Sequence, residues 1–140
     1  MNDQSIFIYT EAFFHNKKEL LELTKSDYQL FTNNLVIYEF VDVIIQELEL
    51  AKNSQNDHRV KVLTNLRDRF PQLIIDLKVV IKDFTLTNEI LLNVYDLMAK
   101  YKMNISDIFH LLTIKEHDIQ FILSKDGDWE RAEGLVKIFE

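Results

Sequence analysis

Residues 5–9 read Ser-Ile-Phe-Ile-Tyr, and Thr10 and Glu11 follow them directly. This apolar run is too short for a helix and is rich in β-branched and aromatic side chains, so it predicts a buried strand. From Thr10 onward the apolar side chains recur at helical spacing, with an interruption expected near residues 15–16. The sequence therefore predicts a strand that leads straight into helical structure.

Strand and helix patterns alternate along the rest of the chain. Further short apolar runs predict strands at residues 28–32, 78–82, 119–123 and 135–139. Helices are predicted between them, at residues 35–52, from about residue 60 to Pro71, at 87–101 and at 104–115. This alternation indicates an α/β fold, a three-layer α/β/α sandwich with a mainly parallel central sheet. The polar residues 53–58 are interpreted as a loop, and residues 1–140 are expected to form a single domain.

The helix predicted at residues 35–52 follows a helix cap at residues 33–34. Its apolar face is assigned to the residues that recur at helical spacing, namely Ile37, Val41, Ile44, Ile45 and Leu48. Glu39 lies off this face on a helical wheel, near Asp42 and Gln46. An ordinary solvent-exposed glutamate is therefore one interpretation of Glu39, and a functional carboxylate is the other.

The charge balance and the rare residue types limit the classes of function. Sixteen Lys and Arg stand against 23 Asp and Glu, a formal net charge of −7. This balance disfavours nonspecific attraction to nucleic-acid phosphates and to anionic lipid, so a nucleic-acid function would need a local site. The absence of cysteine excludes disulfides, thiolate metal sites and a cysteine nucleophile. With only two glycines, neither GxGxxG nor GxxxxGK(S/T) can be written.

The sequence carries no pattern typical of membrane insertion or export. No apolar run approaches the roughly 18 residues of a membrane span. Residues 1–4 are polar and lack the basic-then-apolar pattern of a signal peptide. We therefore expect a cytoplasmic protein that makes no membrane contact.

Polar side chains, most of them acidic, cluster where the predicted strands end. They are Thr10 and Glu11 after the first strand, Glu39 and Asp107 in later helices, and Ser124, Lys125, Asp126 and Asp128 after the fourth strand. In an open parallel sheet, functional groups gather beyond the carboxyl ends of the strands. Carboxylates from several loops supply the oxygen ligands that Mg²⁺ and Mn²⁺ prefer. Ordinary interpretations stay open for two of these residues. Asp107 can serve the start of a helix that follows Asn104, and Asp126 can form a turn with Gly127.

Four short blocks of sequence, residues 5–10, 30–40, 105–111 and 121–129, occur in order along the chain. Together they resemble the blocks of PIN domains, particularly the toxin ribonucleases of the VapC type. The resemblance covers the whole chain, and its specificity lies in the order and separation of the blocks. It implies a metal-dependent endoribonuclease that uses Mg²⁺ or Mn²⁺ and acts on RNA as the toxin of a toxin-antitoxin pair. It also implies a homodimer and an antitoxin protein as partner.

The resemblance assigns roles to the clustered side chains. It places Glu39, Asp107 and Asp126 at the metal-binding acidic positions, Asp128 beside them as a further catalytic carboxylate, and Thr10 and Ser124 at hydroxyl positions that orient substrate or water. Lys125 adjoins this group of carboxylates, so it is expected to meet an RNA phosphate.

One position departs from the family pattern, because the first acidic residue of the family falls on Tyr9. A phenol is a neutral donor and acceptor at neutral pH, so its presence predicts weakened or lost activity. Glu11 is a surrogate ligand candidate, because alternate side chains of a strand share a face. The alternative function is a noncatalytic PIN-like module that binds protein or RNA. His110, three residues after Asp107, is interpreted as a structural residue of an apolar helix.

Overall fold

The computed structural model describes residues 4–15, 17–124, 127–132 and 137–139 of the chain. Within these residues the strands are β1 (Ser5–Ile8), β2 (Gln29–Asn33), β3 (Val80–Lys82), β4 (Phe121–Leu123) and β5 (Lys137–Ile138). The α-helices are α1 (Thr10–His15), α2 (Lys17–Leu23), α3 (Asn34–Asn53), α4 (Asp57–Asp76), α5 (Asn88–Tyr101) and α6 (Ile105–Glu116). A 3-10 helix, η1 (Gly127–Ala132), lies between β4 and β5. None of the described helices combines the length and the apolar character that crossing a membrane requires.

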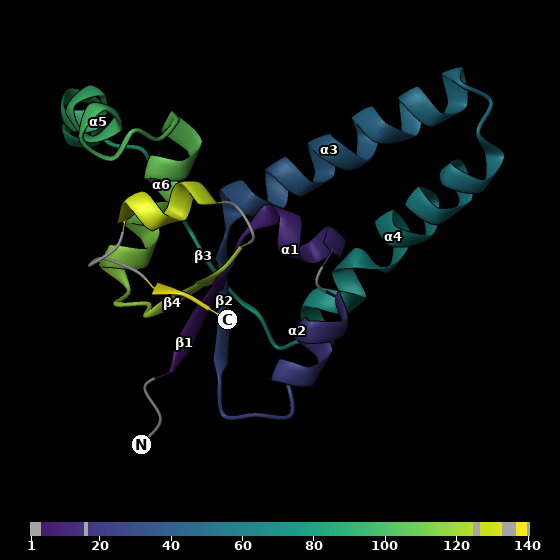
Figure 1. The fold of residues 1–140 in the computed structure, drawn as a ribbon, viewed down its shortest axis with the longest axis horizontal. Helices are drawn as coiled ribbons and strands as arrows, with labels where there is room; N and C mark the ends of the chain where they lie inside the picture. The colour runs from purple at the N-terminus through teal and green to yellow at the C-terminus, as the bar shows by residue number, and fades with distance from the viewer. Residues whose placement is uncertain (1–3, 16, 125–126, 133–136, 140) are drawn as a thin grey trace.

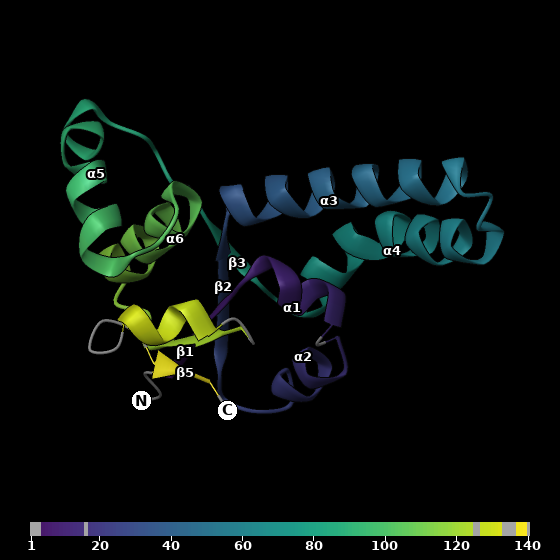
Figure 2. The same cartoon turned by 45° about the horizontal axis from the view of Figure 1, so that its top comes forward.

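The strands form one sheet in the order β3-β2-β1-β4-β5, and each neighbouring pair is parallel. The central strand β1 contributes Ile6, Phe7 and Ile8, which are all fully buried. Helices α1 to α4 lie on one side of the sheet, and α5 and α6 lie on the other (Figures 1 and 2). The predicted three-layer α/β/α sandwich with a parallel sheet is therefore confirmed.

The long helices α3 and α4 run antiparallel and extend away from the sheet as a pair (Figure 1). The predicted end of the second helix near Pro71 is wrong, since α4 continues through the proline to Asp76. Proline removes one helical hydrogen bond, and that loss is tolerated where packing holds the helix on both sides. Here Phe70 and Leu73, which flank the proline, are both buried in the core.

The buried face of α3 differs from the one predicted. It consists of Val36, Phe40, Ile44, Leu48 and Ala51. Val41 and Ile45, which were assigned to the core, are 45% and 55% exposed. The reason is aromatic packing, because the ring of Phe40 stacks on Phe70 of α4 with centroids 3.8 Å apart. With this face of α3 turned toward the core, Glu39, the neighbour of Phe40, is partly buried, with its side chain 32% exposed.

Candidate functional site

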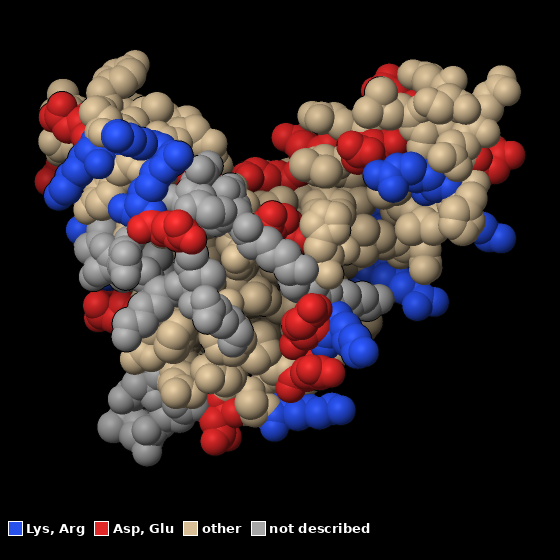
Figure 3. Space-filling model, viewed as in Figure 1, with Lys and Arg blue, Asp and Glu red and all other residues tan. Residues whose placement is uncertain are grey.

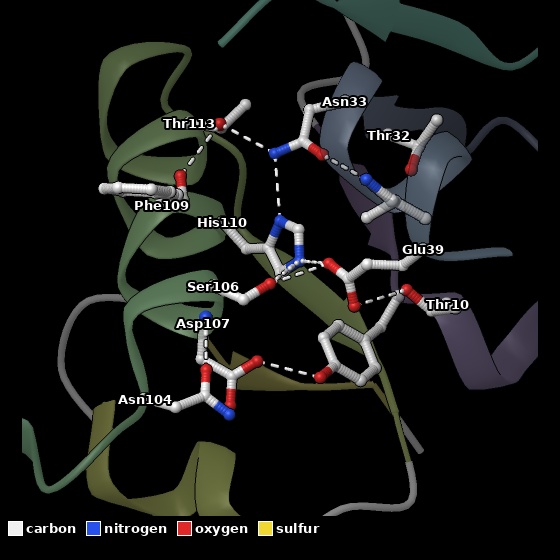
Figure 4. Close-up of polar contacts among 12 residues, drawn as sticks. Thr10, Thr32, Asn33, Glu39, Asn104, Ser106, Asp107, Phe109, His110 and Thr113 are labelled. Carbon is white, nitrogen blue, oxygen red and sulfur yellow. Dashed lines mark hydrogen bonds and ion pairs between the residues drawn. The ribbon is translucent and has the colours of Figure 1, made fainter. Parts of the chain in front are cut away.

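The carboxylate of Glu39 lies beyond the carboxyl end of β1 and is held by three donors from two other helices (Figure 4). Ser106 Oγ and His110 Nε2, both of α6, lie 2.8 Å and 2.6 Å from its Oε1 atom. Thr10 Oγ1, at the start of α1, donates to Oε2 at 3.3 Å. Glu39 is therefore a fixed acceptor between the two helical layers.

The surroundings of Glu39 act on its pKa in opposite directions. Burial raises the pKa because it disfavours the charged form. The hydrogen bond from His110 lowers it, and so do the hydrogen bonds from the two hydroxyls. The hydrogen bonds outweigh burial, and the pKa of Glu39 lies below its ordinary value of 4.5. Glu39 is therefore an ionised carboxylate at neutral pH.

Tyr9 joins the same site from the end of β1. Its hydroxyl donates to Oδ1 of Asp107 at 2.8 Å, and Asp107 is only 3% exposed. The phenol ring also meets His110 and Trp129 edge-on, at centroid distances of 5.5 Å and 5.6 Å. The residue that departs from the family pattern is thus integrated into the site through both its ring and its hydroxyl.

Asp107 enters the site from the first turn of α6. The predicted helix start is confirmed, because Asn104 is the N-cap and its Oδ1 accepts from the backbone N–H of Asp107 at 2.8 Å. The side chain of Asp107 points the other way, toward Tyr9 (Figure 4). The capping interpretation accounts for the backbone N–H of this residue, and the carboxylate makes a separate contact with Tyr9.

A buried polar chain behind Glu39 was missed at the sequence level. His110 and Asn33 are both fully buried, and their Nδ1 and Nδ2 atoms lie 3.0 Å apart. The interpretation of His110 as structural accounts for its burial but not for its contact with Glu39. A signal was present in the sequence, because a histidine in an apolar helix needs a hydrogen-bonding partner once it is buried.

The remaining predicted residues divide into two groups. Ser124 and Glu11 lie together, with Ser124 Oγ donating to Glu11 Oε1 at 2.6 Å. Lys125 and Asp126 lie outside the described residues, as does the side chain of Asp128. The structure thus gathers Thr10, Glu39 and Asp107 around Tyr9, and it pairs Glu11 with Ser124.

A cavity of about 380 Å³ adjoins the site and is lined by Tyr9 and by residues of α1, α3 and α4, among them Thr10, Glu11, Phe14, Glu39 and Arg59. Two of the lining residues, Arg59 and Glu47, form an ion pair, with 2.9 Å between nitrogen and oxygen. Acidic side chains also gather at the base of the hollow between α5 and α3 (Figure 3). The open space next to Glu39 is thus bordered by carboxylates and aromatic rings.

Comparison with known proteins identifies the family of the chain. The family model described as PIN domain matches residues 1–135. The chain belongs to the PIN domain family. The solved structure of PAE2754 from Pyrobaculum aerophilum is similar to this PIN domain, with a TM-score of 0.60 and 11% sequence identity over 96% of this chain and 84% of that chain. At that identity the likeness is one of fold. No curated protein matches the chain.

The PIN domain is a nuclease-type fold, and the family resemblance implies a bound Mg²⁺ or Mn²⁺. Within the part of the chain that the structure describes, no three His, Asp or Glu side chains converge closely enough to hold a metal ion. Glu39 Oε1 already takes two donors, and Asp107 Oδ1 takes the hydroxyl of Tyr9. Of the three predicted ligands, the described residues supply Glu39 and Asp107, which is an incomplete ligand set. A complete site requires a further ligand, and Asp126 is the predicted one.

Proposed function

We propose that this PIN domain derives from the ribonucleases of the toxin class that use Mg²⁺ or Mn²⁺, and that Tyr9 weakens or abolishes its activity. Family membership and the common location of Glu39 and Asp107 beyond the carboxyl ends of the strands support the proposal. The observation that carries it is the hydrogen bond from Tyr9 to Asp107, at 2.8 Å. A phenol that donates to this carboxylate satisfies it without a cation.

The proposed roles follow the predicted ones. Glu39, Asp107 and Asp126 would hold the metal, with Asp128 assisting, Thr10 and Ser124 orienting groups, Lys125 meeting a phosphate and Glu11 as a surrogate ligand. A divalent cation in such a site activates water against a phosphodiester and offsets charge on the leaving oxygen. The donors around Glu39 keep it ionised and aimed, which is the contribution of the protein to that chemistry.

An RNA cleavage assay with Mn²⁺ tests the proposal directly. The native chain, Tyr9→Asp and Asp107→Asn are compared on a mixed RNA panel, with Asp96→Asn of α5 as the matched control for the same substitution at an exposed position. Cleavage by the native chain that Asp107→Asn abolishes and Asp96→Asn retains would support a working site. Cleavage that only Tyr9→Asp shows would support a site disabled by Tyr9. No cleavage in any variant, with no Mn²⁺ binding by calorimetry, would contradict the proposal.

We also propose a cytoplasmic location, which the sequence patterns favour, and a homodimer and an antitoxin partner, for which the family resemblance is the support. The chain mass is 16.7 kDa, so sedimentation equilibrium should give twice that value for a dimer. Sedimentation at the mass of one chain at micromolar concentration would argue against the dimer. Copurification of a second small protein from cells that express the neighbouring genes would test for the antitoxin.

A further inference from the structure

A continuous chain of buried polar groups connects the start of α3 to Glu39. Asn33 and His110 are fully buried, and Thr113 is 1% exposed. Buried polar atoms are stable only when their donors match acceptors, so the direction of each hydrogen bond in this chain can be worked out. Figure 4 shows the chain running from Thr113 through Asn33 and His110 to Glu39.

The helix cap fixes which way the amide of Asn33 points. Its Oδ1 accepts from the backbone N–H of Val36 at 2.9 Å, which only an oxygen can do. Its Nδ2 atom therefore faces His110 Nδ1 and Thr113 Oγ1, each at 3.0 Å. The hydroxyl of Thr113 donates its own proton to the carbonyl of Phe109 at 3.0 Å, so it accepts from Asn33.

This orientation sets the tautomer of the histidine. Because Asn33 Nδ2 carries only donors, Nδ1 of His110 must accept and the proton of the ring lies on Nε2. That Nε2–H points at Glu39 Oε1, 2.6 Å away. With Ser106 donating to the same oxygen, Oε1 is committed to the protein. The second oxygen, Oε2, has the longer contact of 3.3 Å with Thr10, and Glu39 lines the adjoining cavity.

We propose that Asn33 and His110 are positioning residues, in which the helix cap selects the Nε2–H tautomer of His110 and His110 directs Oε2 of Glu39 toward a ligand. The role toward a ligand rests on the proposed function, whereas the selection of the tautomer by the cap does not. A histidine retained only to fill the core would gain equal packing from either tautomer. The proton position therefore separates positioning from simple burial.

Nuclear magnetic resonance of the imidazole nitrogens at neutral pH tests the tautomer in the intact chain. The native spectrum should show His110 with a protonated Nε2 and an unprotonated Nδ1. Asn33→Asp is the informative variant, because aspartate caps helices equally well but replaces the Nδ2 donor by an acceptor. In that variant Nδ1 should gain a proton. Thr113→Val, which leaves the contact between Asn33 and His110 in place, should keep the native pattern.

Two results would overturn the proposal. One is a native spectrum with the proton on Nδ1, which needs no variant to fold. The other is an Asn33→Asp chain that folds with the native pattern unchanged.

The consequence for ligand binding is tested by calorimetry of Mn²⁺ on a Tyr9→Asp background. On that background, His110→Gln keeps a donor for Glu39 and His110→Leu loses it. The two double variants should therefore differ in Mn²⁺ affinity. Loss of such a partner typically weakens metal binding about 10- to 100-fold. His110→Leu should therefore lower the Mn²⁺ affinity by that factor, and His110→Gln should lower it by less. Equal affinity in the two would overturn the positioning role. If no Mn²⁺ binds to Tyr9→Asp itself, the proposed function fails, while the resonance experiment still decides the tautomer.

Discussion

The hydroxyl of Tyr9 and the Oδ1 atom of Asp107 lie 2.8 Å apart although 98 positions separate the two residues in the sequence. The contact joins the end of the central strand to the first turn of α6, which lies on the opposite side of the sheet from α1 to α4. Removal of one partner of a buried hydrogen bond typically costs about 1–3 kcal/mol, because the other partner is left unsatisfied. We therefore expect this contact to stabilise the fold as well as to occupy the site.

Replacement of Tyr9 by phenylalanine should reveal that contribution. Tyr9→Phe keeps the ring contacts with His110 and Trp129 and removes the hydroxyl that donates to Asp107. We expect a loss of about 1–3 kcal/mol in the free energy of unfolding, measured by urea denaturation. The matched control is Tyr95→Phe, since Tyr95 is 79% exposed and its substitution should change stability by less than about 0.5 kcal/mol. Equal effects at the two positions would contradict the assignment.

The aromatic stack between α3 and α4 should dominate the stability of that helix pair. Phe40 is 1% exposed and stacks on Phe70 at an interplanar angle of 14°. Phe40→Ala should therefore cost about 3–5 kcal/mol in denaturant unfolding. Tyr38→Ala on the same helix is the control, because that side chain is 61% exposed. A similar cost at both positions would mean that the face of α3 is not oriented as described.

Much of the architecture could be predicted from local signals, because β1 and the caps of α3 and α6 depend on residues near one another in the sequence. The buried face of α3 could not. Ile37, Val41 and Ile45 fit a helical stripe as well as Val36 and Phe40 do, and only the partner ring of Phe70 on another helix selects between them. The end of α4 was mispredicted for the same reason, since packing overrode the effect of Pro71.

The candidate site shows the same division between local and distant information. The family blocks identified Glu39 and Asp107, but they could not show that Tyr9 donates to Asp107 or that His110 donates to Glu39. Each of these contacts joins residues more than 70 positions apart, at sequence separations of 98 and 71. Such pairings follow from the order of strands in the sheet, which local patterns do not specify.

Pro71 gives a prediction of opposite sign to the others. It lies inside α4, is exposed, and removes one backbone donor from a helix held by Phe70 and Leu73. Pro71→Ala should restore that donor and raise the free energy of unfolding by about 1–3 kcal/mol. Thermal unfolding followed by circular dichroism would show the increase. Had α4 ended at the proline, the substitution would leave the melting temperature unchanged or lower it.

Glu39 should make stability depend on pH in the acidic range. Its pKa in the folded chain lies below the ordinary value of 4.5, so the unfolded chain takes up a proton at this residue first as pH falls. The contribution of Glu39 is therefore complete above about pH 4.5 and is lost as pH falls through the folded pKa. Measured by urea unfolding, Glu39→Gln should be less stable than the native chain at pH 7, and the difference should shrink below pH 4.5.

The control is Glu49→Gln, at an exposed position of α3, whose stability should follow that of the native chain across the whole pH range. A native-to-Glu39→Gln difference that stays constant down to pH 3 would show that the donors around Glu39 do not favour its ionised form.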